Sequence, residues 1–507
     1  MTAAASAPPP DTEVDLDVDV LIVGAGISGL GAAYYLQRDL PDTTYAVVEA
    51  RDALGGTWDL HRYPGVRSDS DLFTFGYEFK PWRGDAIATA GSILGYLREV
   101  ADENRIHDRI RFRTRIAGAS WSSAEARWTV ETENTATGER GRIRCAWLFA
   151  ATGYYRYDQG YVPEFAGRAE FEAAGGTVVH PQHWPEDLDH TGRRVVVIGS
   201  GATAVTLVPA LAGEAGHVTM LQRSPTYVVP LPAKDRIANA LHKVLPEGRA
   251  HALIRAKNVW TQRVTWRLCQ RYPRAARRVI RRLNARSLPP GYPVDEHFNP
   301  RYDPWDQRLC VVPNGDLFKA LSAGTASVVT DTVDTFTATG VRLTSGKHLD
   351  ADVVVTATGL NLQAFGGIDL TVDGAPVDLT GTVAFKGMML TGVPNFAYAI
   401  GYTNSSWTLK VGLLCEHFVR LLAHMDAHGH DTCAPVLPPG LATRPLLDFE
   451  AGYVLRALDR LPKQGPGFPW LTSRDYPSDV KLLRHGPVDD PHLRFTSSAQ
   501  RPAKAAV

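Results

Sequence analysis

The fold is decided by two similar stretches, VLIVGAGISG at residues 20–29 and VVVIGSGATA at residues 195–204. Each joins an apolar, β-branched run to closely spaced glycines and then to a second apolar stretch, which is typical of a phosphate-binding turn between a strand and a helix. The first glycine permits the tight bend, the second lets the backbone approach a pyrophosphate, and the third lets the helix pack closely on the strand. We therefore predict an α/β protein with two Rossmann-like dinucleotide-binding domains. The predicted turn residues are Gly24, Gly26, Ser28 and Gly29 in the first stretch and Gly199, Gly201, Ala202, Thr203 and Ala204 in the second.

The residue that follows the next apolar run differs between the two units. Glu49 follows the run at 45–48, whereas Arg223, with Ser224 beside it, follows the run at 218–221. A carboxylate at this place accepts hydrogen bonds from an unmodified ribose, as in FAD or NAD, while an arginine fits a 2′-phosphate. We therefore predict FAD in the first unit and NADPH in the second, placed so that hydride passes between them in a flavoprotein oxidoreductase.

The overall composition narrows the classes of function. The 507-residue chain is long enough for two or three domains, and its 54 basic residues balance its 54 acidic ones, so no nucleic-acid partner is indicated. Its five cysteines are scattered without a CxxC pair or metal-ligand spacing, which predicts neither a disulfide framework nor a metal site. The Ala- and Pro-rich start lacks the core of a secretion signal, and no run approaches the roughly 20 apolar residues that span a bilayer. We expect a cytoplasmic protein.

Two similar apolar segments mark the places where we expect the chain to cross between domains. LFAATG at 148–153 and VVVTATG at 353–359 both read as buried strands that end in a glycine, and we expect Gly359 to approach a cofactor. The first domain is therefore predicted to be interrupted by the second. The expected segments are a disordered tail at 1–15, the FAD-binding domain at 16–160 and 351–490, the NADP-binding domain at 161–230 and 301–350, a helical insertion at 231–300, and a C-terminal tail at 491–507.

The segment at 234–286 is unusually basic. It carries fifteen Lys and Arg residues against two acidic residues, and interleaved apolar residues predict amphipathic helices. Three uses of this segment stay open: a solvated insertion that covers the active site, a peripheral contact with a membrane surface, and a contact between copies of the chain.

Three further strings carry a family resemblance: LGGTW at 54–58, RYPGVRSDSD at 62–71 and GYTNSSWTLK at 401–410. Together with the two nucleotide turns, they are typical of class B flavin monooxygenases and especially of Baeyer-Villiger monooxygenases. The chain resembles this family nearly end to end, and within it the ethionamide-activating type of bacterial monooxygenase.

The resemblance implies a reaction. FAD, NADPH and O₂ would insert one oxygen atom beside a ketone carbonyl, through a C4a-peroxyflavin, to give an ester or lactone, and the same enzyme would oxidise thioethers or thioamides. Two alternatives stay open: a flavin S- or N-monooxygenase without appreciable Baeyer-Villiger activity, and a non-catalytic flavin-binding sensor. A pyridine-nucleotide disulfide reductase would need a redox cysteine pair near the flavin, which the sequence lacks.

The resemblance also assigns roles to residues. It places the family's essential arginine, a fixed cation beside the flavin, at Arg308, and it places the acid that orients this arginine and contributes to the flavin environment at Asp69. Gln307 stands where relatives carry a lysine for the 2′-phosphate, so the preference for NADPH over NADH is expected to rest on Arg223 and Ser224. The further cofactor-binding residues are expected to be Gly56, Thr57, Trp58, Arg67 and Trp407.

The family's fingerprint, of the form FxGxxxHxxxW, precedes the second nucleotide turn. Gly176, His180 and Trp184 stand at the right mutual spacing, and we expect them to act as linker or gating residues rather than as a base. Ala174 stands where phenylalanine is expected, and the nearest aromatic residue, Phe171, stands three positions earlier, as if residues were inserted before Gly176. The departure therefore concerns the linker between domains rather than the reaction class.

Overall fold

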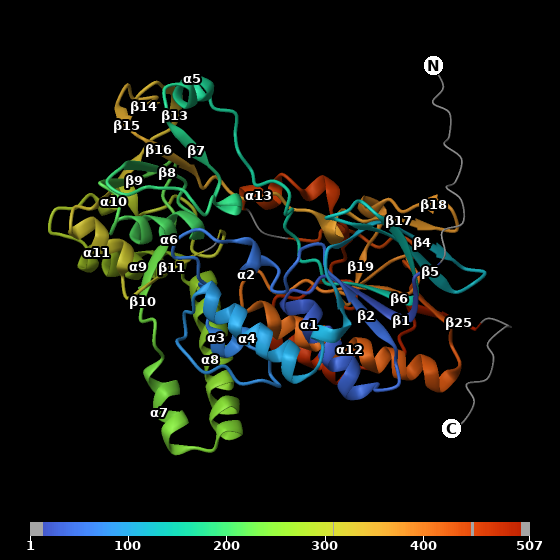
Figure 1. Cartoon of the computed structure of the whole chain (residues 1–507). Coiled ribbons are helices and arrows are strands. Elements are labelled where there is room, and N and C mark those ends of the chain that lie inside the picture. Colours follow the sequence, from blue (N-terminus) through green and yellow to red (C-terminus); the bar gives the residue numbers. More distant parts are fainter. Residues whose placement is uncertain (1–13, 308, 448–450, 498–507) are drawn as a thin grey trace.

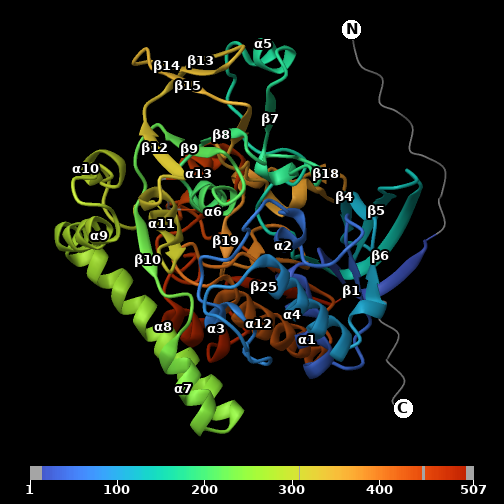
Figure 2. The same cartoon turned by 60° about the vertical axis from the view of Figure 1, so that its left-hand side comes forward.

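The computed structural model describes residues 14–307, 309–447 and 451–497 of the chain. It has two α/β lobes, each built on its own sheet, and a helical insertion that extends away from the lobes (Figure 1, Figure 2). Residues 1–13 of the expected N-terminal tail and residues 498–507 of the expected C-terminal tail lie outside the described residues.

The first lobe is built on a mixed sheet in the order β18-β17-β4-β5-β6-β1-β2-β3, with β21 also beside β6. The strands β3, β2, β1, β6 and β21 run parallel, as a βαβ unit requires, and β4 and β5 form an antiparallel extension. Alternate residues of β1 serve two cores: Val20 and Ile22 pack with α1, α4 and α12, whereas Leu21 and Val23 pack on the other face. The bounds are β1 (Leu16–Val23), β2 (Tyr45–Val48), β3 (Ile110–Arg111), β4 (Thr114–Ser122), β5 (Arg127–Asn134), β6 (Arg140–Ala150), β17 (Asp369–Val372), β18 (Ala375–Pro376), β21 (Phe396–Tyr398), α1 (Ile27–Asp39), α4 (Ala90–Glu103) and α12 (Trp407–His428).

The second lobe is built on a parallel sheet in the order β12-β9-β8-β16-β7. Val195 and Val197 of β8 pack against α6 and α11, and Val196 and Ile198 pack beneath a small antiparallel sheet formed by β13, β14 and β15. The bounds are β7 (Thr177–Val179), β8 (Arg194–Ile198), β9 (His217–Gln222), β12 (Ala326–Thr330), β13 (Val333–Thr337), β14 (Gly340–Leu343), β15 (His348–Asp350), β16 (Val353–Thr356), α5 (Arg168–Ala173), α6 (Ala202–Leu211) and α11 (Asp316–Ser322).

Two segments differ from the expected domain boundaries. β16 pairs with β7 and β8 in the second sheet, so the chain does not return to the first lobe at residue 351 and re-enters that sheet only at β17. The segments at 148–153 and 353–359 are similar because each ends beside a glycine turn. The first belongs to the sheet of the first lobe and the second to the sheet of the second lobe. β25 (Leu493–Thr496) pairs with β22 (Thr432–Pro435), so the expected C-terminal tail begins with a strand that is part of the fold.

The basic segment forms the predicted helical insertion. α7 (Arg236–Val244) and α8 (Glu247–Arg271) form a hairpin that projects from the body, and α9 (Pro273–Ser287) and α10 (Val294–His297) lead back to it (Figure 1, Figure 2). β10 (Val228–Leu231) and β11 (Cys310–Pro313), which flank the insertion in sequence, pair in parallel at its base. The insertion therefore leaves the second lobe and returns to it at a fixed point.

Candidate active site

The first glycine turn has no room for side chains. Gly24 has a left-handed φ of +104°, and a Cβ atom on it would lie 2.8 Å from the carbonyl oxygen of Ala151. A Cβ atom on Gly29 would lie 1.9 Å from the carbonyl oxygen of Gly24. Helix α1 begins at Ile27, and its N-cap residue, Gly26, offers no side chain to the first N–H groups. These donors are available to an anion at the positive end of the helix.

Glu49 lies at the end of β2, directly beside this turn. Its Oε2 accepts a hydrogen bond from the backbone N–H of Ala25 at 2.8 Å, and its Oε1 accepts one from the N–H of Arg51 at 3.0 Å. Burial raises the pKa of Glu49, and the two backbone donors oppose this shift. Each carboxylate oxygen can accept a further bond, so the side chain is held in place and still able to bind ribose hydroxyls.

The other predicted residues of the first site converge on the same turn. Gly56, with a φ of +57°, lies so close that its Cβ would be 3.2 Å from the Cα of Gly26. The indole N–H of Trp407, at the start of α12, donates a hydrogen bond to Ser28 Oγ at 2.9 Å. The predicted Thr57 and Trp58 begin α2 (Thr57–Leu60), directly after Gly56. The LGGTW and GYTNSSWTLK strings therefore meet at the first glycine turn.

The helical insertion also contacts this region, through α8. Asp71 caps α3 (Leu72–Phe75), because its side chain accepts hydrogen bonds from the N–H groups of residues 73 and 74. Asn258 of α8 donates to the same carboxylate at 3.0 Å, and Arg255 donates to the carbonyl oxygen of Gly76 at 3.0 Å. Part of the basic segment is thus used to hold α8 against the RYPGVRSDSD region.

Gln262 of α8 links α3 to the GYTNSSWTLK string. Its Nε2 donates to Thr74 Oγ1 at 3.0 Å, and its Oε1 accepts from Ser405 Oγ at 2.8 Å. Ser406 Oγ also lies 2.7 Å from Thr74 Oγ1. Sequence reasoning missed these residues. The signal that could have found them is the spacing of two amides, Asn258 and Gln262, which stand four positions apart and therefore on one face of the helix.

The RYPGVRSDSD string connects the two lobes. A Cβ atom on Gly65 would lie 2.7 Å from the Cβ of Ala210, so the turn packs directly on α6 of the second lobe. Arg67 forms an ion pair with Asp316 of α11, with 2.5 Å between Nη1 and Oδ2. Arg67, which we predicted to bind cofactor, therefore bridges the lobes in this structure.

Only one of the two predicted catalytic residues, Asp69, lies within the described residues. Arg308 lies outside them. Asp69 is half-buried in the connection between the lobes. Burial raises the pKa of Tyr63 to about 12, and the negative charge of Asp69 adds to this shift. The hydroxyl of Tyr63 interacts in turn with Thr203, at the start of α6, so the side chain of Tyr63 reaches the second glycine turn.

The second glycine turn repeats the close packing but is more open. Gly199 has a φ of +141°, and its Cβ would lie 2.2 Å from the carbonyl oxygen of Ala357. A Cβ on Gly201, the N-cap residue of α6, would meet no atom of the described residues within 4 Å. Arg223 and Ser224 follow β9 and are exposed.

A second arginine lies near Arg223. The guanidinium of Arg456 lies 3.5 Å from the ring centroid of Tyr161, and its Nη2 is 3.4 Å from the carbonyl oxygen of Leu360. Burial lowers the pKa of Arg456, and the positive charge of Arg223 contributes to that shift. Sequence reasoning missed Arg456 because it comes from the C-terminal part of the chain, far in sequence from the second nucleotide unit.

The displaced aromatic residue of the fingerprint reaches its glycine in space. A Cβ on Gly176 would lie 2.4 Å from the ring of Phe171, which is fully buried. The N–H of Gly176 also donates to the carbonyl oxygen of Phe171 at 2.9 Å. Helix α5 and the turn after it absorb the three extra residues, so Phe171 packs on Gly176 although Ala174 stands in the expected position.

His180 joins the segments that cross between the lobes. Its Nδ1 accepts a hydrogen bond from the N–H of Gln182 at 3.1 Å, which leaves Nε2 to donate to the carbonyl oxygen of Gly359 at 3.2 Å. Burial lowers the pKa of His180, so the ring is neutral near pH 7. The ring packs so closely on Gly160 that a Cβ atom there would strike it. Trp184 packs at the edge of the hydrophobic core of the second lobe.

Comparison with known proteins agrees with this architecture. Residues 18–248 match the family model described as "Pyridine nucleotide-disulphide oxidoreductase". A solved structure of an oxidised steroid monooxygenase bound to NADP has a TM-score of 0.77 at 22% identity, and covers 95% of this chain and 100% of its own. An open structure of cyclohexanone monooxygenase has a TM-score of 0.72 at 21% identity with the same coverage. The fold is therefore that of Baeyer-Villiger monooxygenases, with two dinucleotide-binding domains.

The curated relatives define the family. The chain is 53% identical over 490 residues to the FAD-containing monooxygenase EthA of Mycobacterium tuberculosis (strain ATCC 25618 / H37Rv), which covers 96% of this chain and 99% of the relative. It is 47% identical over 495 residues to the probable FAD-binding monooxygenase AlmA of Acinetobacter baylyi, at 96% and 98% coverage. The chain belongs to the FAD-containing monooxygenases, and it is an FAD-dependent enzyme.

The cysteines separate this chain from disulfide reductases that share the architecture. All five cysteines lie within the described residues, and each is buried and free.

No helix in the described part of the chain is both long enough and apolar enough to cross a membrane.

Proposed function

We propose that this enzyme is an FAD- and NADPH-dependent Baeyer-Villiger monooxygenase that inserts one oxygen atom of O₂ beside a ketone carbonyl to give an ester or lactone. We include the oxidation of thioethers or thioamides in the same proposal. The observation that carries it is the pair of unlike nucleotide turns, one beside the buried Glu49 and one beside the exposed Arg223, joined by the segment that holds Asp69.

The residues of the first turn fit FAD. A Cβ on Gly24 or Gly29 would strike a backbone carbonyl oxygen, so the tight turn requires glycine at both positions, and the open N–H groups of α1 suit a diphosphate. Glu49 would hold the ribose hydroxyls. Bound FAD would accept hydride from NADPH and activate O₂. We also propose that Thr57, Trp58 and Trp407 line this site.

The residues of the second turn fit NADPH. The space beside Gly201 admits a diphosphate at the start of α6, and Arg223 with Ser224 would bind the 2′-phosphate. Arg456 adds a second positive charge on this side. Because Gln307 is neutral, these two arginines would supply the charge-assisted contacts that distinguish NADPH from NADH.

The catalytic roles follow from charge. A reacting oxygen atom gains negative charge during the transfer, and a fixed guanidinium beside it lowers the energy of that state. We assign this role to Arg308 and the orientation of its guanidinium to Asp69. Tyr63, which contacts Thr203, would hold the segment that carries Asp69 against the second glycine turn. Gly176, His180 and Trp184 would act as the linker between lobes.

Product analysis tests the proposed reaction. The FAD-loaded protein is supplied with NADPH, O₂ and either methyl pentyl ketone or a simple thioether, and ester, sulfoxide and hydrogen peroxide are quantified. We expect ester from the ketone and sulfoxide from the thioether, with little hydrogen peroxide. Sulfoxide without ester would identify an S-monooxygenase, and NADPH consumption matched by hydrogen peroxide with both substrates would contradict oxygen transfer.

Arg308→Ala serves as the matched variant. It should retain FAD and NADPH-driven flavin reduction but release hydrogen peroxide in place of ester, because the fixed cation acts after reduction. Unchanged ester formation would remove Arg308 from the catalytic role. Unchanged biological behaviour of the variant in cells would favour a flavin-binding sensor.

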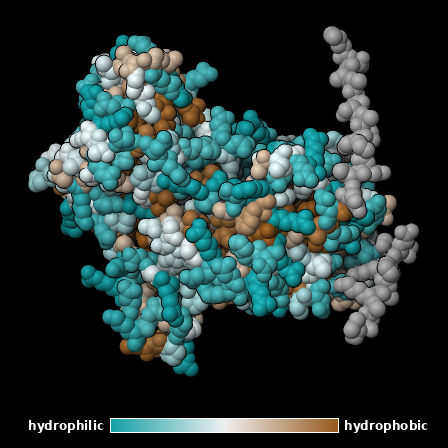
Figure 3. All heavy atoms as spheres, viewed as in Figure 1, coloured by the Kyte–Doolittle hydropathy of each residue, from teal (hydrophilic) through white to brown (hydrophobic). Residues whose placement is uncertain are grey.

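We also propose that the insertion contacts an anionic lipid surface through the end of the α7–α8 hairpin. Val244, at the end of α7, is 75% exposed, and Ile237, two turns earlier in the same helix, is 58% exposed. Lys243, next to Val244 in sequence, and Arg249, in the first turn of α8, are exposed as well. Figure 3 shows apolar atoms gathered at the lower end of the insertion, between hydrophilic ones. Apolar side chains rimmed by positive charge suit a surface of acidic headgroups.

Vesicle sedimentation tests this contact. The protein should sediment with phosphatidylglycerol vesicles and remain in solution with phosphatidylcholine vesicles, and Val244→Ser with Ile237→Ser should abolish the difference. Leu437→Ser, at an exposed apolar residue outside the insertion, is the matched control. No binding by the unaltered protein contradicts the contact, and concentration-dependent self-association lost in the same double variant would assign the surface to a homo-oligomer.

A further inference from the structure

Helix α8 has a polar stripe on the side that packs against the first lobe. Arg255, Asn258 and Gln262 recur at intervals of three and four residues, so their side chains lie on one side of the helix. Arg255 and Asn258 are buried, and Gln262 is half-buried. Buried polar groups cost free energy unless they are bonded, so this stripe indicates specific partners.

Two of these side chains hold the short helix α3 at its two ends. Asn258 donates to the capping carboxylate of Asp71 at 3.0 Å, and Arg255 donates to the carbonyl oxygen of Gly76, directly after the helix, at 3.0 Å. The position and the direction of α3 are therefore fixed relative to α8. Because Asp71 stands two positions after Asp69, the same bonds restrict the segment that carries the predicted catalytic acid.

Gln262 bonds both the middle of α3 and the GYTNSSWTLK loop. Its amide nitrogen donates to Thr74 Oγ1 at 3.0 Å, and its amide oxygen accepts from Ser405 Oγ at 2.8 Å. The next residue, Ser406, is the N-cap of α12, where a serine ordinarily bonds the first N–H groups of its own helix. Its hydroxyl forms no such bond and lies 2.7 Å from Thr74 Oγ1 instead. The loop thus forgoes a stabilising helix cap for a contact with α3.

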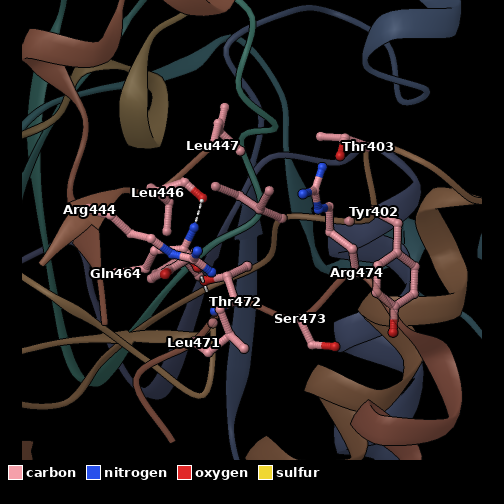
Figure 4. Close-up of a pocket in the computed structure, with 14 residues that line it drawn as sticks. Tyr402, Thr403, Arg444, Leu446, Leu447, Gln464, Leu471, Thr472, Ser473 and Arg474 are labelled. Carbon is pink, nitrogen blue, oxygen red and sulfur yellow. Dashed lines mark hydrogen bonds between the residues drawn. The ribbon is translucent and has the colours of Figure 1, made fainter. Parts of the chain in front are cut away.

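The first part of the same loop borders a cavity. Residues 400–403 form one wall of a space of about 160 Å³, and its other walls include residues 444–447 and 471–474 (Figure 4). Atoms that line a void lack packing partners on one side, so packing fixes this part of the loop only weakly. Tyr402 and Asn404 are bonded to Asp479 and to the carbonyl oxygen of Arg474, and Gln262 bonds the residue that follows. Hydrogen bonds therefore contribute more than packing to the position of the loop.

These contacts lead to the first glycine turn. Trp407 follows Ser406 directly, and its indole N–H donates to Ser28 Oγ at 2.9 Å. The Trp407 ring packs so closely on Gly401 that a Cβ atom there would lie 2.5 Å from it. The ring thus moves together with the loop. Any shift of the loop away from Gln262 would change the contact between Trp407 and the first turn.

The C-terminal end of α8 contacts a further string of the predicted active site. Gln270 Nε2 donates to the carbonyl oxygen of Pro304 at 3.4 Å. Pro304 begins the string PWDQR at 304–308, which ends in the predicted catalytic Arg308. One helix of the insertion therefore contacts the string that ends in Asp71, the GYTNSSWTLK loop and the PWDQR string.

We propose that Gln262 is a positioning residue of the flavin site. It holds the loop at 401–407 against α3, and through this loop it keeps Trp407 on the first glycine turn, where FAD binds. Gln262 acts through the loop and does not need to touch the cofactor. This inference rests on the proposed FAD site at the first turn, to which it adds a residue of the helical insertion.

The rate of FAD release from the purified holoenzyme measures this role. Released FAD is followed by the rise of its fluorescence after dilution. We expect Gln262→Leu, which removes both hydrogen bonds of the amide, to release FAD roughly threefold to tenfold faster. The visible circular dichroism of the bound flavin, which reports on the surroundings of its ring, should change as well. Unchanged release with an unchanged spectrum would overturn the proposal.

Lys257→Gln is the matched control in the same helix. Lys257 bonds Asp235, the cap of α7, so its loss weakens the α7–α8 hairpin without removing a contact with the flavin loop. The FAD release and the flavin spectrum of this variant should match those of the unaltered protein, even if its Tm falls. Equally fast release from Lys257→Gln and Gln262→Leu would mean that any weakening of the insertion loosens FAD, and it would overturn the specific role of Gln262.

Ser405→Ala tests the route from Gln262 to the loop. It removes one hydroxyl group from a half-buried residue and should also speed FAD release. Because the two residues share one bond, the double variant should release FAD no faster than Gln262→Leu alone. An increase in the double variant equal to the product of the two separate increases would overturn this route. Unchanged release from Ser405→Ala would overturn the proposal even if Gln262→Leu does not fold.

The two proposals fail in different ways. Flavin retained in Gly29→Ala would reject the first turn as the FAD site. Flavin lost in Gly29→Ala, but released from Gln262→Leu at the rate of the unaltered protein, would keep the FAD site and reject the role of Gln262.

Discussion

The two glycine turns are alike in backbone and unlike in surroundings. Around the first, Glu49 is buried, Gly56 lies against Gly26, and Trp407 bonds Ser28. Around the second, the N-cap glycine of α6 borders open space, and Arg223 is exposed. The same loop motif is thus enclosed in one lobe and open in the other. An enclosed site suits a cofactor that stays bound, and an open site suits one that is exchanged at each turnover.

The largest effect should come from closing the first turn. In Gly29→Ala the new Cβ would lie 1.9 Å from the carbonyl oxygen of Gly24, so the turn must open and the diphosphate cradle is lost. We expect purified protein without flavin, measured as the ratio of flavin to protein. Gly95→Ala, in the middle of α4 with no atom within 4 Å of the new Cβ among the described residues, should keep its flavin. Full flavin content in Gly29→Ala would contradict the first site.

Closing the second turn should separate the two cofactors. Gly199→Ala places a Cβ 2.2 Å from the carbonyl oxygen of Ala357, at a φ of +141°. We expect this variant to keep FAD and to lose flavin reduction by NADPH, measured anaerobically from the flavin absorbance. Loss of FAD together with NADPH reduction would mean that the lobes do not bind separate nucleotides.

Buried histidines of the first lobe should make its stability depend on pH. Burial lowers the pKa of His61 to about 4 and of His417 to about 3, below the ordinary value of 6.5. Between these values and 6.5 the unfolded chain binds protons that the folded chain does not, so the free energy of unfolding falls as the pH is lowered from 6.5. The fall attributable to His61 alone is about 3 kcal/mol.

Denaturant titrations over this pH range, followed by flavin release, measure the effect. His61→Gln should flatten the dependence, whereas His428→Gln, at an exposed residue, should not. A stability that does not change between pH 6.5 and 4 in the unaltered protein would show that these rings are protonated in the folded state.

The smallest effect should be on cofactor choice. Arg223→Gln should raise the KM for NADPH about tenfold and leave that for NADH nearly unchanged, because an exposed charge-assisted contact to the 2′-phosphate is lost. Arg342→Gln, at an exposed arginine in the same lobe, is the control. Steady-state kinetics with both nucleotides decide the matter, and an equal change for NADPH and NADH would assign Arg223 a structural role. The same change in Arg456→Gln would show that the two arginines share the contact.

Much of the fold and of the first nucleotide site could be predicted from local sequence patterns. The glycine spacing and the apolar runs predicted both sheets, and Glu49 lies beside the first turn because β2 ends where a βαβ unit requires it. The pairing of strands that are far apart in sequence could not be predicted from such local patterns. β16 resembles the strand before Gly153 but pairs in the other sheet, since any strand that ends near a nucleotide needs the same small residues.

The contacts of the insertion were also hidden. Gln262 bonds Thr74 and Ser405, which are far from it in sequence, and its helix was read only through its charge. Phe171 reached Gly176 through a short helix and turn that a fixed motif spacing does not represent. In both cases the missing information was the spatial route of the chain rather than the chemistry of the residue.

Anaerobic rapid mixing of the purified protein with NADPH or NADH tests the central claim most directly. The account predicts that FAD remains bound after gel filtration, and that NADPH reduces it at a rate that saturates at much lower concentration than with NADH. Flavin lost on gel filtration, or reduction that is equally efficient with both nucleotides, would contradict an enclosed FAD site facing an open site built for a 2′-phosphate.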